Sequence, residues 1–134
     1  MRELLAPYDI AKLMQSVGFN ERCLTCYKTD KSVFMSDDWA YGMTKEDLTK
    51  EWMDCLAPTY EQVMNWLMIN HDIKFGIYPC IDDSNSPNEF HLNIYKNNNI
   101  CFSAISCTNI DYSYFYITLI RICVQPENNL INIK

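Results

Sequence analysis

The spacing of apolar residues predicts that the chain begins with a short amphipathic helix. One helical face is marked by apolar residues three and four positions apart, namely Ile10, Leu13, Met14 and Val17. Pro7 suits the first turn of this helix, and Gly18 stands where a left-handed residue commonly ends one. After the helix, residues 23–27 and 31–35 are expected to form two short strands.

Two capping patterns predict two helices in the middle of the chain. Thr44 and Asp47 are expected to open the first, whose inward side would carry Leu48, Trp52 and Cys55. Pro58 ends that helix, because the residue before a proline is pushed out of the helical region. Thr59 and Gln62 open the second helix, with an apolar stripe formed by Val63, Trp66 and Leu67.

Beyond residue 72 the period changes from helical to alternating. Residues 73–77 and 90–95 alternate apolar and polar side chains, residues 100–105 are expected to form a third strand, and turn-forming residues separate these segments. Three consecutive strands of this kind predict an antiparallel meander, with one apolar face that needs cover.

The last element, residues 112–124, has features of both a helix and a strand. Its helical stripe consists of Tyr112, Tyr116, Leu119, Ile120 and Cys123, with Thr108 or Asp111 as the cap. Residues 114–118 also have strong strand character. The need for a layer over the meander favours the helix.

These elements predict an α+β fold with two layers. The three-strand meander and one or two N-terminal strands would form an antiparallel sheet, with helices packed on one face. A length of 134 residues is close to that of one domain, so residues 1–134 are expected to form a single domain with a tail over residues 127–134.

The net charge of −6 and the sequence pI of about 4.7 argue against direct nucleic-acid binding, because such proteins neutralise phosphates with basic residues. The acidity is concentrated in residues 30–61, which hold eight acids and three lysines. This window is either a solvated face that maintains solubility or a patch for a basic partner.

Cysteine usage and hydropathy favour a cytoplasmic protein. The seven cysteines lie mostly in apolar surroundings, as buried free thiols do in a reducing compartment. The first ten residues include charged side chains and do not resemble a signal peptide. The longest apolar candidate for a membrane span, residues 115–124, is interrupted by Thr118 and Arg121. We therefore expect no membrane association.

The sequence assigns no catalytic, metal-binding or cofactor-binding residue. Cys23 and Cys26 have the spacing of half a zinc knuckle or of a redox pair, but a second pair of soft ligands is missing. His71 falls at a helix end and His91 on the polar face of a strand. Residues 82–85 lack the spacing of a calcium loop. An enzyme with an unassigned Cys–His or carboxylate site stays open as an alternative.

The acidic window also holds two large aromatic residues, Trp39 and Tyr41. Tryptophan and tyrosine are favoured anchors of protein interfaces, although both rings would also suit the domain's own core. The candidate partner-binding residues are Asp37, Asp38, Trp39, Tyr41, Glu46, Asp47, Glu51 and Asp54.

Residues 57–63, Ala-Pro-Thr-Tyr-Glu-Gln-Val, and the following Trp66 resemble a family of small uncharacterised proteins from phages and prophages of Bacteroides-type bacteria. Residues 1–20 and 70–77 are similar to that family as well. Members end in a helix rich in Ala and Glu, whereas residues 113–124 here are aromatic and β-branched. The resemblance implies a fold and a viral origin, with the cytoplasm of an infected or lysogenic bacterium as location, but no activity.

We therefore expect a non-enzymatic protein that binds a host or phage protein through an acidic surface bearing aromatic residues. Inhibition of a bacterial defence or host process is one form of this hypothesis. The alternative is a minor virion or assembly protein that forms homo-oligomers and buries its aromatic residues 112–116.

Overall fold

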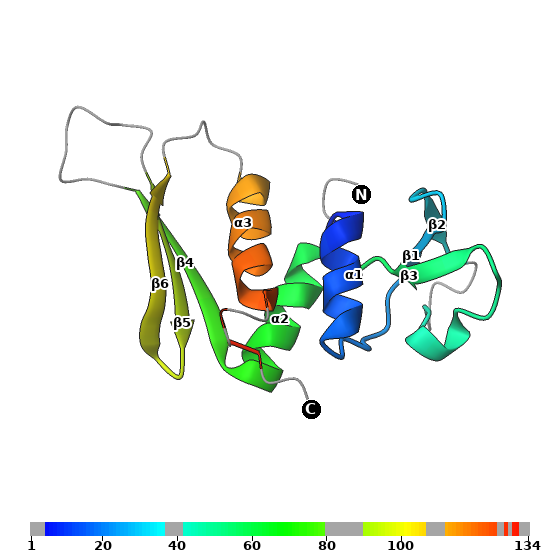
Figure 1. Ribbon diagram of the computed structural model, residues 1–134, viewed down its shortest axis with the longest axis horizontal. Helices are drawn as coiled ribbons and strands as arrows, with labels where there is room; N and C mark the ends of the chain where they lie inside the picture. The colour runs from blue at the N-terminus through cyan, green and yellow to red at the C-terminus, as the bar shows by residue number, and fades with distance from the viewer. Residues whose placement is uncertain are drawn as a thin grey trace. The chain divides into compact units, whose positions relative to one another are not determined.

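The computed structural model describes residues 5–36, 42–79, 90–106, 112–125, 128, 130 and 131 (Figure 1). The chain divides into two compact units, residues 1–66 with 133–134 and residues 67–132. The elements of the first unit are α1 (Tyr8–Ser16), β1 (Thr25–Lys28), β2 (Val33–Met35), the 3-10 turn η2 (Lys45–Asp47) and β3 (Met53–Leu56). The boundary between the units falls within α2 (Tyr60–His71), and the second unit adds β4 (Ile73–Pro79), β5 (Phe90–Lys96), β6 (Asn99–Ser106) and α3 (Tyr112–Val124).

The predicted first helix is confirmed as α1. Pro7 is its N-cap residue, and Gly18 follows its C-terminal end with a φ of +98°, a conformation that glycine adopts at little cost. Ile10 and Met14 are fully buried.

The first unit contains a three-stranded antiparallel sheet in the order β2-β1-β3. Tyr27 and Cys55 are paired across β1 and β3, and they pack with Ala11 of α1 and with Ala57 in one buried cluster. The Tyr27 hydroxyl donates a hydrogen bond to the Ala6 carbonyl, at 2.6 Å. One face of this sheet is therefore covered by α1.

The helix predicted for residues 44–55 is wrong. Thr44 opens only the single 3-10 turn η2, and the chain then enters β3. Cys55 and Leu56 are buried because β3 pairs with β1, with Cys26 opposite Leu56. Pairing in the sheet outweighs the weak helical preference of the segment.

The α+β class is confirmed, with a difference in the sheets. Residues 25–35 form strands as expected, but these strands pair with β3 in a sheet of their own and do not extend the meander. The sequence pattern predicts which residues of a strand face the core, but it does not predict which strands pair with one another.

The second capping box is confirmed at the start of α2. The Thr59 N–H donates to the Gln62 side-chain oxygen at 3.0 Å, and the Gln62 N–H donates to the Thr59 hydroxyl at 3.1 Å. On this helix Val63 and Leu67 are fully buried.

The meander of the second unit is confirmed in the order β4-β5-β6. Asn97 and Asn98 both have positive φ in the turn between β5 and β6, which matches the twist of a tight hairpin. The predicted C-terminal helix is confirmed as α3, which packs against β5 (Figure 1). The buried residues of this unit include Ile73, Leu92, Ile94, Leu119, Ile120 and Cys123.

None of the helices in the described ranges has the length and apolarity to cross a bilayer.

The Lys96 ammonium donates to the Leu130 carbonyl, and Ile131 is buried.

The burial pattern of α2 provides a paired test of stability. We expect Leu67→Ala to lower the free energy of unfolding by about 2–5 kcal/mol, because Leu67 is fully buried and its truncation leaves a cavity. Ile69, two residues away and 75% exposed, is the matched control. Ile69→Ala should change the same quantity by no more than about 0.5 kcal/mol in urea unfolding. Equal losses would contradict the burial described for this helix.

Candidate protein-binding surface

Four of the eight candidate partner-binding residues lie within the described structure. Glu46 and Asp47 are on η2, Glu51 precedes β3, and Asp54 is in β3. The other four, Asp37, Asp38, Trp39 and Tyr41, lie outside the described residues. The structure does not gather the four described acids into one cluster, because each has a different local environment.

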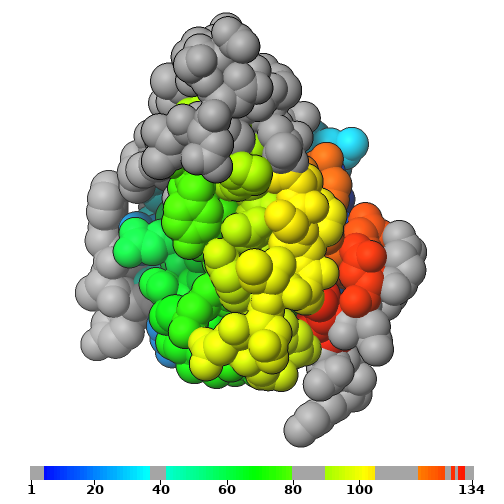
Figure 2. All heavy atoms as spheres, turned by 90° about the vertical axis from the view of Figure 1, so that its left-hand side faces the viewer, coloured from blue at the N-terminus to red at the C-terminus, as the bar shows by residue number. Residues whose placement is uncertain are grey.

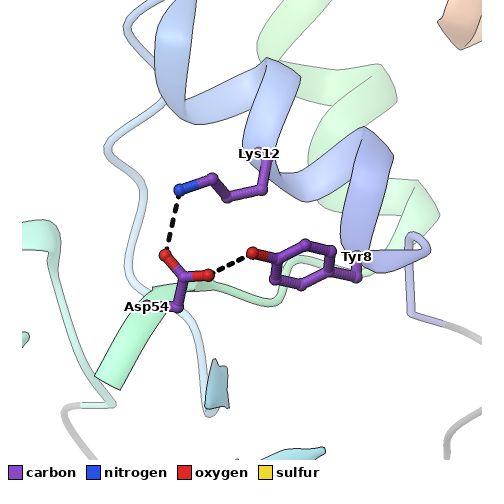
Figure 3. Close-up of polar contacts among 3 residues, drawn as sticks. All are labelled: Tyr8, Lys12 and Asp54. Carbon is purple, nitrogen blue, oxygen red and sulfur yellow. Dashed lines mark hydrogen bonds and ion pairs between the residues drawn. The ribbon is translucent and has the colours of Figure 1, made fainter. Parts of the chain in front are cut away.

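Asp54 makes contacts within its own unit (Figure 3). Its carboxylate accepts a hydrogen bond from the Tyr8 hydroxyl. It also forms an ion pair with the Lys12 ammonium, in which Nζ and Oδ1 are 2.9 Å apart. These two hydrogen bonds, with Tyr8 the stronger influence, hold the pKa of Asp54 below its usual range. The same carboxylate raises the pKa of Tyr8 and of Lys12. Asp54 therefore links β3 to α1, and Lys12 neutralises its charge.

Asp47 and Glu46 also have local partners. The Asp47 carboxylate accepts from the Thr44 N–H at 2.9 Å, and this backbone hydrogen bond is the main reason that its pKa is lowered. Glu46 accepts from the Asn20 side-chain amide at 3.4 Å, and its pKa is lowered chiefly by its own backbone N–H. Both carboxylates are exposed, so each keeps an ionised charge at the surface.

An exposed tryptophan stands beside Glu51. The Trp52 side chain is 40% exposed, and its ring meets the Phe34 ring edge to face, with centroids 5.0 Å apart and an interplanar angle of 72°. The Lys28 ammonium lies 5.8 Å from the Trp52 ring centroid, a cation–π distance. We call Lys28, Phe34, Glu51 and Trp52 the Trp52 surface.

The backbone holds Trp52 in this position. Its carbonyl accepts from the Thr29 N–H, at 3.0 Å, where β1 ends. Phe34 lies opposite Cys26 in the sheet and therefore on the face away from Tyr27, which α1 covers. The ring is thus ordered before any partner arrives.

Sequence reasoning missed Trp52 as a surface residue. Its four- and three-residue spacing to Leu48 and Cys55 matched a helical stripe and placed the ring in the core. The sequence signal for the strand was weak, because residues 53–56 are mostly apolar and end two positions before Pro58, a pattern typical of a short strand and of a helix end alike.

Cys23 and Cys26 have the properties of buried thiols. Both side chains are buried, and this burial raises the pKa of Cys23 to about 12 and also raises that of Cys26. A redox cysteine needs a lowered pKa, so these two are poor thiolates. No metal-binding group of three His, Cys, Asp or Glu side chains occurs among the residues described.

The two histidines lie at different places in the second unit. His71 ends α2, and burial, with a smaller effect of Lys96, lowers its pKa, so the ring is neutral at pH 7. His91 lies on β5 opposite Tyr78. Residues 82–85 fall outside the described ranges.

Comparisons of the chain with family models, with curated proteins and with solved structures found no match. The resemblance of residues 57–66 to phage proteins stays a prediction. The function is therefore argued from the geometry above.

The Asp54 contacts lead to a pH-dependent effect on stability. Because the pKa of Asp54 is lowered in the folded state, its contribution is present above the ordinary carboxyl pKa near 4 and is lost as the pH falls through the folded value. We expect Asp54→Asn to lower the free energy of unfolding by about 1 kcal/mol at pH 7. The difference from wild type should shrink below about pH 4.

Urea unfolding from pH 7 to pH 3 measures this difference. Glu51→Gln is the matched control, because Glu51 is exposed and should show no such trend. A difference for Asp54→Asn that stayed constant across the pH range would contradict the assignment.

Thiol exposure gives a second test. Cys101 is exposed, whereas Cys23, Cys55 and Cys123 are buried. Desolvation raises the pKa of all four thiols, and it does so most for the three buried ones. We expect iodoacetamide to modify Cys101 before these three in the native protein, followed by peptide mass spectrometry. Unfolding in urea should remove the difference, and early modification of Cys55 would contradict the core of the first unit.

Proposed function

We propose that this protein is a non-enzymatic binding protein that recognises a partner protein through the Trp52 surface. The observation that carries the proposal is the exposed Trp52 ring held against Phe34. Tryptophan is enriched among the few residues that dominate binding energy in protein interfaces. A ring already ordered by its own unit loses little conformational freedom on binding.

The charge distribution suggests a basic partner. The window of residues 30–61 carries a net charge of −5, and Asp30, Glu46, Asp47 and Glu51 are exposed within it. Exposed charges around an aromatic anchor steer the encounter and select the partner more than they add affinity. Lys28 sits on the Trp52 ring, and Asp54 is paired with Lys12. The exposed acids that would meet a partner are thus Asp30, Glu46, Asp47 and Glu51, with Asp37 and Asp38 as candidates from the sequence.

The resemblance of residues 57–66 to phage proteins supports a host or phage protein as the partner. It also supports a bacterial cytoplasm as the location. In the first unit the thiols of Cys23 and Cys55 are buried with raised pKa values, and the Asp54 carboxylate is paired with Lys12, which supports a binding role over a catalytic one for these groups.

The proposal is tested with the immobilised full chain and bacterial lysate. We expect at least one basic protein to be enriched by wild type and lost with Trp52→Ala. With that partner purified, Trp52→Ala should raise the Kd about 30-fold or more, which corresponds to a loss of about 2 kcal/mol. Glu51→Lys should raise the Kd less and reduce its dependence on salt.

Ile69→Ala is the matched control, because it removes an exposed apolar side chain in the second unit. Its capture profile should equal that of wild type. If Trp52→Ala, while folded by circular dichroism, captured the same proteins with the same affinity as wild type, the Trp52 surface would not be the binding site.

A further inference from the structure

Strand β2 is the outer strand of its sheet, in the order β2-β1-β3, so one of its edges is unpaired within the described part of the chain (Figure 1). Such an edge presents backbone N–H and C=O groups to any further strand, and natural proteins commonly protect it with charged side chains, prolines or bulges. The Val-Phe-Met sequence of β2 contains no charge and no proline. Its register against β1 is regular, so β2 has no bulge either.

The other three edge strands each have such a protection. The register of β3 against β1 shifts at Asp54, an extra residue without a partner in the ladder. A bulge of the same kind occurs in β6 at Cys101. Strand β4 carries the exposed Lys74 and ends at Pro79. Among the four described edges, β2 is therefore the one best suited to accept another strand.

The hydrogen bonds of the β1–β2 hairpin show which backbone groups of β2 point outward. The Ser32 carbonyl and the Ser36 N–H are each hydrogen-bonded, at 2.8 Å, to a backbone group at or next to an end of β1. Backbone groups of alternate residues point to the same side of a strand, so those of Phe34 also point to β1. The N–H and C=O groups of Val33 and Met35 therefore point to the open edge. Met35 is 39% exposed, so solvent reaches this edge.

These outward groups define the chemistry of a ligand. Two N–H donors and two C=O acceptors, spaced two residues apart along an extended strand, match the backbone of another extended polypeptide. The residue of that polypeptide opposite Phe34 would lie on the same face of the sheet, about 5 Å away. The Phe34 and Trp52 rings meet on this face, with centroids 5.0 Å apart. An added strand would thus place a side chain next to the Trp52 surface.

We propose that the partner bound at the Trp52 surface contributes an extended peptide segment that pairs with β2 and places an apolar side chain beside Phe34. This inference rests on the proposed function, because it describes how the same partner is held. Main-chain hydrogen bonds to Val33 and Met35 supply part of the affinity, and the side chain beside Phe34 supplies part of the specificity.

A second copy of this chain is a weaker candidate for the same edge. Each copy has a net charge of −6, so two copies repel each other. Pairing of β2 with its own copy joins 3 residues of each chain, far fewer than the roughly 20–30 residues that each side of a stable interface contributes. The basic partner proposed above is attracted by the charge, and its contact continues onto the Trp52 surface.

The test uses peptides as the probe. A phage-displayed library of random dodecapeptides is selected on the immobilised full chain, and the enriched peptides are synthesised. We expect at least one of them to slow hydrogen exchange of the Val33 and Met35 amides about tenfold or more, as measured by NMR on the full chain. This measurement uses the wild-type protein, so it does not depend on how well a variant folds.

Met35→Pro removes one outward N–H and keeps the hydrogen bonds to β1, because proline is tolerated in an edge strand where its nitrogen points outward. Met35→Leu is the matched control, since it changes the side chain and keeps the N–H. We expect Met35→Pro to weaken peptide binding about tenfold or more. Met35→Leu should bind as wild type does.

The captured partner separates this inference from the proposed function. If Trp52→Ala loses the partner while Met35→Pro binds it as wild type does, the Trp52 surface stands and the pairing with β2 is overturned. The reverse result would keep the pairing and remove the Trp52 surface. Two further results would overturn the pairing: no enriched peptide slows exchange at Val33 and Met35, or light scattering detects a dimer that Met35→Pro dissociates.

Discussion

The candidate binding surface depends on one constraint: side chains alternate across a strand, and each of the two sheets has three strands in the described part of the chain. In the first unit, α1 covers the face that carries Tyr27 and Cys55. In the second, α3 packs against β5 on the face that carries Leu92 and Ile94. In the first unit the opposite face supplies Phe34 to the Trp52 surface, and in the second the opposite face of the sheet is the one turned to the viewer in Figure 2. The face that each helix covers therefore decides which side chains of the sheet can meet a partner.

The pairing of β3 with β1 shows how much follows from such a choice. The register of β3 against β1 shifts at Asp54, which has no partner in the ladder, so its carboxylate can reach Tyr8 and Lys12 although the adjacent Cys55 also lies on the α1 face. The same pairing stops any helix from continuing past Asp47, so Trp52 emerges from a turn and packs on Phe34. One carboxylate is thereby withdrawn from the acidic surface, and one aromatic ring is added to it. A count of charges along the sequence would have registered neither change.

The sequence was sufficient where a local pattern had one dominant solution. The stripe of α1, the capping box of Thr59 and Gln62, and the alternation in β4 and β5 all recur in the structure. It was insufficient where the spacing of Leu48, Trp52 and Cys55 suited a helix but a distant strand offered β3 a better partner.

The exposure of the Trp52 ring follows from its supports. Trp52 projects from a turn and is braced on one side by Phe34, so much of its ring is left to insert into a complementary pocket. Its carbonyl accepts from the Thr29 N–H, which holds the turn against the end of β1. The pairing of β1 with β3 therefore decides both that the ring is exposed and which of its sides is left open.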